Sequence, residues 1–195
     1  MSYIIYDTEI CHGIATPDNP PQPGYRYAAG WTDFAGMGIA VIAAYDLQEA
    51  QSRVFMADNF EAFAELVDRR DGVIGFNNWQ FDDKLLRANG LGIPAGKSID
   101  IAAGIWRAAG IPQGDHPRGL GLDDCCKANR LPGKSGKGAD APQDFQSGRI
   151  GRVIDYCLGD VRCTLQLYRH IARCSGLVDP RDGKTWLNVP LIGMP

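Results

Sequence analysis

The stretch "YIIYDTEI" at residues 3–10 joins an apolar run to two carboxylates, Asp7 and Glu9, which stand one residue apart. Side chains at positions i and i+2 of a β-strand point to the same face, so these two carboxylates converge. Removing a bare charge from water without a partner is heavily penalised. The stretch therefore predicts either that this face is exposed to solvent or that a positive group belongs beside it.

The composition of the 195-residue chain, 45% hydrophobic and 22% charged, is ordinary for a globular protein and predicts a single domain over 1–195. Within it, a motif-bearing core covers about 3–174 and a tail covers 176–195. No apolar run approaches the roughly 18 residues of a membrane span, and the N-terminus lacks the basic region of a signal peptide. The six cysteines form no CxxC pair, so we expect reduced thiols in a cytoplasmic protein and no zinc site.

Hydrophobic periodicity predicts a mixed α/β layer architecture, because strands dominate the first half of the chain and helices the second. The strands are expected at 3–7, 25–31, 38–45, 52–57 and 72–77, and the helices at 59–70, 79–90, 120–131 and 149–173. The segment 97–110 is expected to be the end of a strand that runs into a helix. The segments 25–31 and 38–45 are expected to pair with each other. Asn59 is the expected N-cap of one helix and Gly90 the expected end of another. The tail is expected to form a small hairpin or a surface wrap.

Two later stretches add acidic residues to the pair on the first strand. Asp82 follows an expected strand and lies in the first turns of a helix, where the helix dipole favours an anion. Tyr156 and Asp160 stand at i and i+4 on one face of the longest helix. Each feature alone has a structural explanation, but four carboxylates brought together would repel one another and their pKa values would rise. Mg²⁺ or Mn²⁺ relieves that repulsion, and two such ions ~4 Å apart support phosphodiester hydrolysis.

The stretches "YDTE", "GFNNWQFD" and "YCLGD" together resemble the three motifs of the DEDD superfamily of 3′–5′ exonucleases. Tyr156, four residues before Asp160, matches the DEDDy branch; the sister branch has histidine where Asp155 stands. The resemblance covers roughly 3–171 and is closest to exonucleases related to the proofreading domain of B-family DNA polymerases, because "GLGLDDCCKANRLPGKSGKG" at 119–138 is similar to their segment before the third motif. It implies a ribonuclease-H-like fold, with a mixed central β-sheet flanked by α-helices.

The resemblance also implies a role for each of five residues and two divalent cations, Mg²⁺ or Mn²⁺, as cofactors. Asp7 would bridge both ions, and Glu9 and Asp160 would complete the ligands of the ion beside the attacking water. Asp82 would hold the second ion, mainly through water. Tyr156 would aim the attacking water, because a free pKa near 10 makes a pure general-base role unfavourable. The products would be a 5′-mononucleotide and a chain shorter by one nucleotide.

Residues beside the first two motifs are candidates for substrate binding. Ile10, Cys11 and His12 leave the first motif, where relatives wedge the terminal base; His12 has the alternative reading of an exposed loop residue. Asn77 and Asn78 are placed to contact the terminal nucleotide, although a turn at a strand exit also favours asparagine.

Two aromatic residues and a basic segment add further candidates. Phe81 and Trp79 are able to stack on a base, although the sequence favours Phe81 as a core residue. The segment 118–152 holds more basic than acidic residues and forms either a positive rim that follows the phosphate backbone or a solvated loop. Its basic residues are Arg118, Lys127, Arg130, Lys134, Lys137, Arg149 and Arg152. A phosphate-loop reading of "ANRLPGKSG" is rejected, since Ala128 stands where that pattern requires glycine.

The sequence thus predicts a metal-dependent 3′–5′ exonuclease that acts on single-stranded ends, DNA in preference to RNA because of the polymerase-type resemblance. The alternatives are an RNA-trimming enzyme of the ribonuclease D type and a catalytically silent nucleic-acid-binding module. The net charge of −3 gives no overall attraction for nucleic acid, so binding would depend on local cations or bound metal. A separate polymerase or repair factor is the expected protein partner, and no membrane partner is expected.

Overall fold

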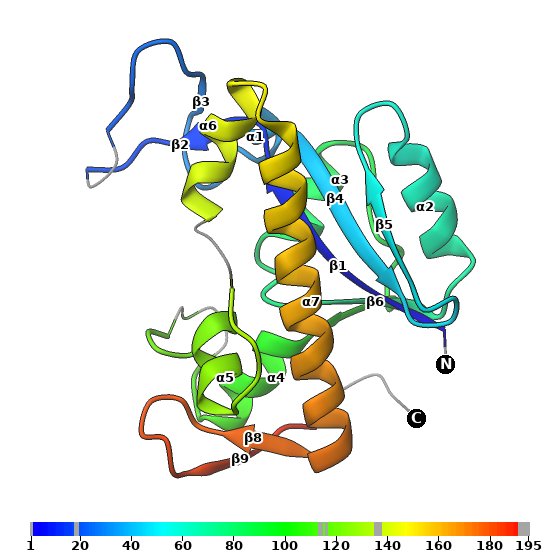
Figure 1. Ribbon diagram of the computed structural model, residues 1–195, viewed down its shortest axis with the longest axis vertical. Coiled ribbons are helices and arrows are strands. Elements are labelled where there is room, and N and C mark those ends of the chain that lie inside the picture. Colours follow the sequence, from blue (N-terminus) through cyan, green and yellow to red (C-terminus); the bar gives the residue numbers. More distant parts are fainter. Residues whose placement is uncertain (1, 18–19, 113–114, 116, 135–137, 191–195) are drawn as a thin grey trace.

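The centre of the molecule is a five-stranded mixed sheet with the strand order β5-β4-β1-β6-β7 (Figure 1). The computed structural model describes residues 2–17, 20–112, 115, 117–134 and 138–190. The central strand β1 pairs antiparallel with β4 and parallel with β6. The five strands are β1 (Tyr3–Ile10), β4 (Ile39–Asp46), β5 (Gln51–Phe55), β6 (Gly72–Gly75) and β7 (Ser98–Asp100). The predicted mixed α/β architecture is confirmed.

Helices cover both faces of this sheet, and two small strand pairs lie near opposite ends of the long helix α7 (Figure 1). The helices are α1 (Phe34–Met37), α2 (Phe60–Asp68), α3 (Asp82–Ala88), α4 (Ile101–Ala108), α5 (Leu122–Ala128), α6 (Ala141–Gln146) and α7 (Ile150–Cys174), with a 3₁₀ turn at Gly138–Asp140. The strand pairs are β2 (Gly13–Ile14) with β3 (Tyr27–Ala28), and β8 (Gly176–Val178) with β9 (Trp186–Asn188). In the part of the chain that the structure describes, no helix combines the length and apolarity required to cross a membrane.

The two faces of β1 pack against different helices. Tyr3 and Ile5 belong to a buried cluster that includes residues of α4, α5 and α7. Ile4 and Tyr6 belong to a second cluster, built with α2 and α3. Because side chains alternate along a strand, Asp7 and Glu9 continue the face that packs on α7, and Thr8 continues the opposite face. The alternation therefore decides which helix each motif residue meets.

Several local predictions are confirmed with small shifts in their ends. The first strand continues through Ile10 instead of stopping at Asp7, because its pairing with β4 extends along both carboxylates. The tail forms the predicted hairpin at β8 and β9, and Gly90 ends α3 with a left-handed φ of 83°. Asn59 stands at the N-cap of α2, but its side chain accepts a hydrogen bond from Met56 N at 2.6 Å and makes no bond to the helix.

The predicted pairing of 25–31 with 38–45 is wrong. The strand β4 pairs with β1 and β5, and the short strand β3 pairs in parallel with β2. Gly30, with φ 155°, breaks the extended run, and Asp33 then caps α1 by accepting a hydrogen bond from Gly36 N at 2.9 Å. The two apolar runs, which predicted a hairpin, are therefore separated by a turn and the helix α1. The helix α6, which begins with proline at its first turn, was not predicted either.

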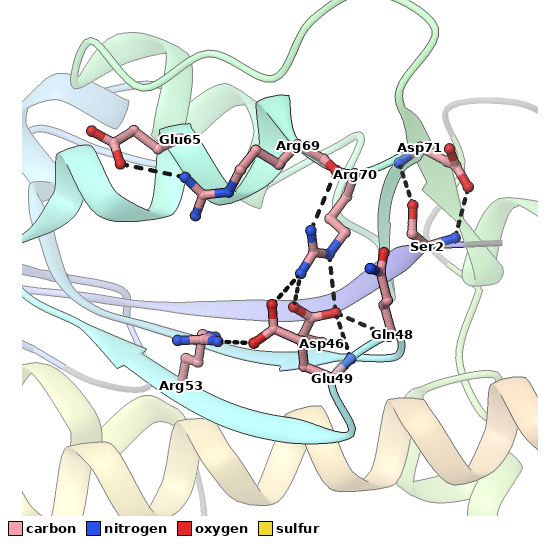
Figure 2. A network of polar contacts seen from close by, with 9 residues as sticks. All are labelled: Ser2, Asp46, Gln48, Glu49, Arg53, Glu65, Arg69, Arg70 and Asp71. Atoms are coloured by element: carbon pink, nitrogen blue, oxygen red, sulfur yellow. Dashed lines mark hydrogen bonds and ion pairs between the residues drawn. The ribbon is translucent and has the colours of Figure 1, made fainter.

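A buried ion pair holds the far end of β4 against the loop after α2 (Figure 2). Arg70 Nη2 lies 2.6 Å from Asp46 Oδ2 and 2.7 Å from Glu49 Oε1, and Arg70 Nε donates to Asp46 Oδ1 at 3.1 Å. The Asp46 side chain is fully buried and that of Arg70 is only 6% exposed. Because both charges are removed from water, each depends on the other for compensation.

We expect Arg70→Ala to lower the free energy of unfolding by about 3–5 kcal/mol, since it leaves the buried Asp46 carboxylate without its cationic partner. The matched control is Arg69→Ala, whose exposed partner Glu65 lies 3.6 Å away and whose loss should change stability by no more than about 0.5 kcal/mol. Urea denaturation of both variants measures the difference. Equal effects of the two substitutions would contradict the structural role of the buried pair.

Candidate active site

Three carboxylates from two elements meet where β1 lies against α7. One oxygen from each of Asp7, Glu9 and Asp160 lies within 4.8 Å of the other two. Glu9 is 7% exposed and Asp160 is 4% exposed, so this group is largely removed from water. Asp7 and Glu9 come from the α7-facing side of β1, and Asp160 comes from the buried side of α7. The strand alternation and the helical period thus bring together residues about 150 positions apart.

The fourth carboxylate, Asp82, reaches the same place from the start of α3. Its Oδ1 accepts hydrogen bonds from Thr8 N at 3.0 Å and from Thr8 Oγ1 at 2.5 Å. Thr8 stands between Asp7 and Glu9 and faces the opposite side of the strand. The tripeptide 7–9 therefore presents two carboxylates of its own on one face and binds the Asp82 carboxylate through the residue between them. The sequence interpretation missed Thr8, although strand alternation would have assigned it to the α3 side.

The neighbouring Asp83 has a different role from Asp82. Its carboxylate accepts hydrogen bonds from the Tyr6 hydroxyl, from Ser98 Oγ at 2.6 Å and from Asn78 Nδ2 at 3.3 Å. These partners join β1, β7 and the loop before α3. Asp83 therefore braces the second sheet face, and Asp82 alone of this pair lines the cleft described below.

Burial and mutual repulsion make the four carboxylates hard to ionise. Burial, followed by repulsion from Asp82 and Asp160, raises the pKa of Asp7 well above its ordinary value. Burial and the charge of Asp160 do the same to Glu9. Burial raises the pKa of Asp82 to about 7, despite the hydrogen bonds from Thr8. Burial also raises the pKa of Asp160. Positive charge placed beside these carboxylates would therefore stabilise their ionised form.

Lys134 supplies part of that positive charge. Its Nζ lies 2.5 Å from Asp160 Oδ2 and 3.4 Å from the Tyr156 hydroxyl. Burial lowers the pKa of Lys134, but the Asp160 carboxylate outweighs this and raises the pKa above its ordinary value, so the ammonium stays charged. Burial and the Asp160 charge also raise the pKa of Tyr156 well above its ordinary value. Tyr156 is therefore a neutral phenol beside the carboxylates, suited to orienting a ligand.

The donor set fits divalent cations with oxygen ligands. Asp160 Oδ1 is buried and has no hydrogen-bond partner among the described residues, although the other oxygen of the same carboxylate binds Lys134. One lysine does not neutralise four carboxylates, and each remaining charge raises the pKa of the others. Hard cations such as Mg²⁺ or Mn²⁺ prefer carboxylate oxygens and relieve this repulsion. The residues present therefore fit the cations expected from the sequence.

The carboxylates form one end of a cleft of about 460 Å³ whose other walls are mostly apolar. This volume lies within the usual range of small-molecule sites, roughly 300–1,000 Å³. The remaining lining residues are Thr8, Ile10, Gly13, Ile14, Thr16, Trp31, Phe76, Asn77, Phe81, Gly138, Ala139, Pro142 and Tyr156. A second hollow of about 310 Å³ shares Asp7, Phe76 and Asn77 with it and reaches Lys134. The carboxylates thus stand between an apolar space and a more polar one.

Three of the candidate binding residues, Ile10, Asn77 and Phe81, line the main cleft. Asn77 adopts a left-handed φ of 63°, and its backbone N–H donates to Asp100 Oδ1 at 2.9 Å. Asp100 Oδ2 also accepts from Trp79 N at 3.1 Å. Asp100, which the sequence interpretation missed, therefore holds the loop that presents Asn77.

The structure places the other candidates outside the lining of this cleft. Asn78 is fully buried, and its Nδ2 donates to Ser98 Oγ at 2.8 Å. Cys11 and His12 contact the turn at the end of α1: Cys11 N donates to Gly38 O at 3.2 Å. Lys137 lies outside the described residues. Their substrate-binding roles stay predictions.

Comparisons with known proteins agree with this geometry. The sequence model of a family described as "Predicted 3′-5′ exonuclease related to the exonuclease domain of PolB" matches residues 114–189, a segment that contains Lys134, Tyr156 and Asp160. No curated protein sequence matches the chain.

Among solved structures, the chain is similar to the family B DNA polymerase from the hyperthermophilic archaeon Pyrobaculum calidifontis, with 14% identity and a TM-score of 0.60. The match covers 88% of this chain and 24% of the polymerase chain, so the chain spans about a quarter of that protein's length. The fold is therefore ribonuclease-H-like, as in the exonuclease domain of family B polymerases. The two comparisons together bear out the resemblance to polymerase-type exonuclease domains.

The raised pKa of Asp82 predicts a stability that depends on pH in the metal-free protein. Between about pH 4 and pH 7 the folded state holds a proton that the unfolded chain, with a carboxyl pKa near 3.9, has released. The free energy of unfolding in EDTA should therefore fall by roughly 1–4 kcal/mol between about pH 5 and pH 8. Saturating Mg²⁺ or Mn²⁺ should restore it at pH 8, because the cations bind only the folded state. Urea denaturation at both pH values measures this.

Asp82→Asn is the control for that experiment. It removes the titrating group, and its amide oxygen can still accept the two hydrogen bonds from Thr8. Burial lowers the pKa of His170, so His170 contributes stability that is lost as the pH falls, opposite in sign to Asp82. This contribution cancels when wild type is compared with the variant. If the difference in free energy of unfolding between the two proteins does not change with pH, the raised pKa of Asp82 is refuted.

Proposed function

We propose that this protein is a metal-dependent 3′–5′ exonuclease that shortens single-stranded nucleic acid, DNA in preference to RNA, and releases 5′-mononucleotides. The observation that carries the proposal is the convergence of Asp7, Glu9, Asp82 and Asp160 in one cleft beside Tyr156. Four carboxylates held together out of water destabilise the metal-free fold, and a binding-only module has no use for that arrangement. The preference for DNA rests on the likeness to polymerase-type exonuclease domains.

Asp7, Glu9 and Asp160 would hold one divalent cation, and Asp7 with Asp82 the other. When bound, two such ions lower the pKa of an attacking water and stabilise the charge on the leaving oxygen. The bond broken joins the last phosphorus to the 3′ oxygen of the preceding nucleotide, which leaves as a hydroxyl. The terminal nucleotide departs with the phosphate as a 5′-monophosphate. Thr8 keeps Asp82 in place during this step through its two hydrogen bonds.

Tyr156 and Lys134 would orient the reacting groups. The Tyr156 hydroxyl lies among the carboxylates as a neutral phenol, so we assign it to aiming the attacking water. Lys134 remains charged beside Asp160 and would attract the terminal phosphate as it enters. The pairing with Asp160 also fixes the direction of the lysine side chain, which otherwise has several free rotamers.

The decisive test is digestion of matched single-stranded DNA and RNA, labelled at the 5′ end, with Mg²⁺, Mn²⁺ or EDTA. We expect a metal-dependent ladder of products shortened from the 3′ end, with DNA degraded faster. Asp160→Asn should lower kcat at least about 100-fold, because it removes a charged ligand from the cluster. Electrophoresis of the labelled products measures both results.

Asp155→Asn is the matched control, since Asp155 is an exposed carboxylate on the same helix and should leave the ladder unchanged. Identical ladders from wild type and Asp160→Asn would assign the cleavage to a contaminant. Binding of either polymer without cleavage by folded wild type would favour the binding module instead. Faster shortening of RNA would favour the RNA-trimming alternative.

Tyr156→Phe separates orientation from metal binding. The substitution removes only the hydroxyl, so we expect kcat to fall about 10- to 100-fold through misplacement of the attacking water. The affinity for Mn²⁺, measured by titration calorimetry, should change less than threefold, because no carboxylate is lost. A kcat within twofold of wild type would exclude Tyr156 from the reaction.

A further inference from the structure

Trp31 stands at the rim of the candidate active site with an unusually exposed side chain. It is 65% exposed and lines the same cleft as the four carboxylates. Among the described residues, the other exposed large hydrophobic side chain is Trp186, which lies on β9 at the opposite end of the molecule (Figure 1). An indole left in water forfeits the stabilisation that burial of its apolar surface would bring. Its exposure beside the cleft therefore indicates that a ligand covers the indole when it binds there.

The turn that carries Trp31 is held in place by its own hydrogen bonds. Asp33 Oδ2 accepts from Ala29 N at 2.9 Å, and Asp33 Oδ1 accepts from Gly36 N at 2.9 Å. Asp33 N in turn donates to Gly30 O at 3.1 Å. One carboxylate thus closes the turn on both sides of Trp31. A ligand that binds the indole therefore has little backbone entropy to remove.

The same turn is tied to the catalytic motifs. His12 Nδ1 lies 2.7 Å from Gly36 O, which joins the end of the first motif to α1. The Phe34 ring of α1 packs edge-on against Phe81, with the centroids 5.9 Å apart, and Phe81 precedes Asp82 at the start of α3. Trp31 is therefore held at a defined position relative to the carboxylate-bearing elements β1 and α3.

Much of the cleft that Trp31 shares with the carboxylates is apolar. Ile10, Ile14, Phe81 and Pro142 line it. A strand whose last phosphodiester lies at the carboxylates would have its nearest bases in this apolar part of the cleft, which Trp31 also lines. Aromatic side chains that stack on bases hold single strands without reading their sequence, because every base has a π-face.

We propose that Trp31 is a stacking platform for an unpaired nucleobase adjacent to the nucleotide being removed. The inference rests on the proposed exonuclease function and adds the subsite that would select single strands. A base in a duplex keeps its face covered by its neighbours, so only an unpaired strand offers it to the indole. The platform also explains why a tryptophan is left exposed on a rigid turn beside a cluster of carboxylates.

The test measures steady-state shortening of a 5′-labelled oligodeoxythymidylate by wild type, Trp31→Ala, Trp31→Phe and Trp186→Ala. Loss of one stacked base should raise KM for Trp31→Ala about 10- to 100-fold, with a much smaller change in kcat. Trp31→Phe, which keeps an aromatic face, should recover most of the affinity. Trp186→Ala should behave as wild type, because it removes an equally apolar exposed side chain far from the cleft.

A second measurement tests whether the indole and the base contact each other. Abasic residues are moved one position at a time through the last few nucleotides of the substrate. In wild type, one upstream position should raise KM about as much as Trp31→Ala does, and the same abasic site should have little further effect on that variant. Full additivity of the two changes would overturn the proposal.

The two proposals fail in different ways. Wild type that shortens no polymer with either metal would overturn both of them. Wild type and Trp186→Ala that shorten DNA, together with a Trp31→Ala variant of unchanged KM, would overturn only the platform. In that case the indole would belong to a contact with another protein, and the exonuclease assignment would stand.

Discussion

The repulsion among four carboxylates gathered in one cleft, three of them buried, is the constraint on which this structure depends. Burial raises the pKa values of Asp7 and Glu9, and the charges of Asp82 and Asp160 raise both of them further. A single lysine, paired with Asp160, compensates only part of that charge. The sheet and helices around the cluster must therefore be stable enough to hold it in place.

The framework that resists this repulsion is built from both faces of one strand. Tyr3 and Ile5 are buried on one face of β1 and Ile4 and Tyr6 on the other, so the strand cannot rotate or shift without exposing a core. A one-residue shift would exchange the faces of every side chain and would turn the carboxylates away from α7. The ion pair of Arg70 with Asp46 holds the neighbouring strand at the other end of the sheet. Stability and site geometry thus come from the same packing.

Local patterns were sufficient where one element carries the signal. The periodic apolar residues of 59–70 and 149–173 predicted the helices α2 and α7, and the run at 3–10 predicted the central strand. They failed for the pairing of 25–31, of which only Tyr27–Ala28 is a strand and pairs with β2, because Asp33 caps a helix soon after it. The hydrogen bonds of Thr8 with Asp82 and of Asp100 with the Asn77 loop join residues more than twenty positions apart, so no local pattern reported them.

By itself, the sequence determined that two carboxylates share one face of a strand, that a third begins a helix, and that a fourth lies one turn after a tyrosine. These relations follow from the fixed repeats of strand and helix, which every residue in such an element obeys. Only the tertiary structure decided that all four meet in a single cleft, that Lys134 is paired with Asp160, and that Trp31 faces the same space. Such contacts depend on how the sheet and helices pack against one another, and packing is set by the whole buried surface rather than by any one segment.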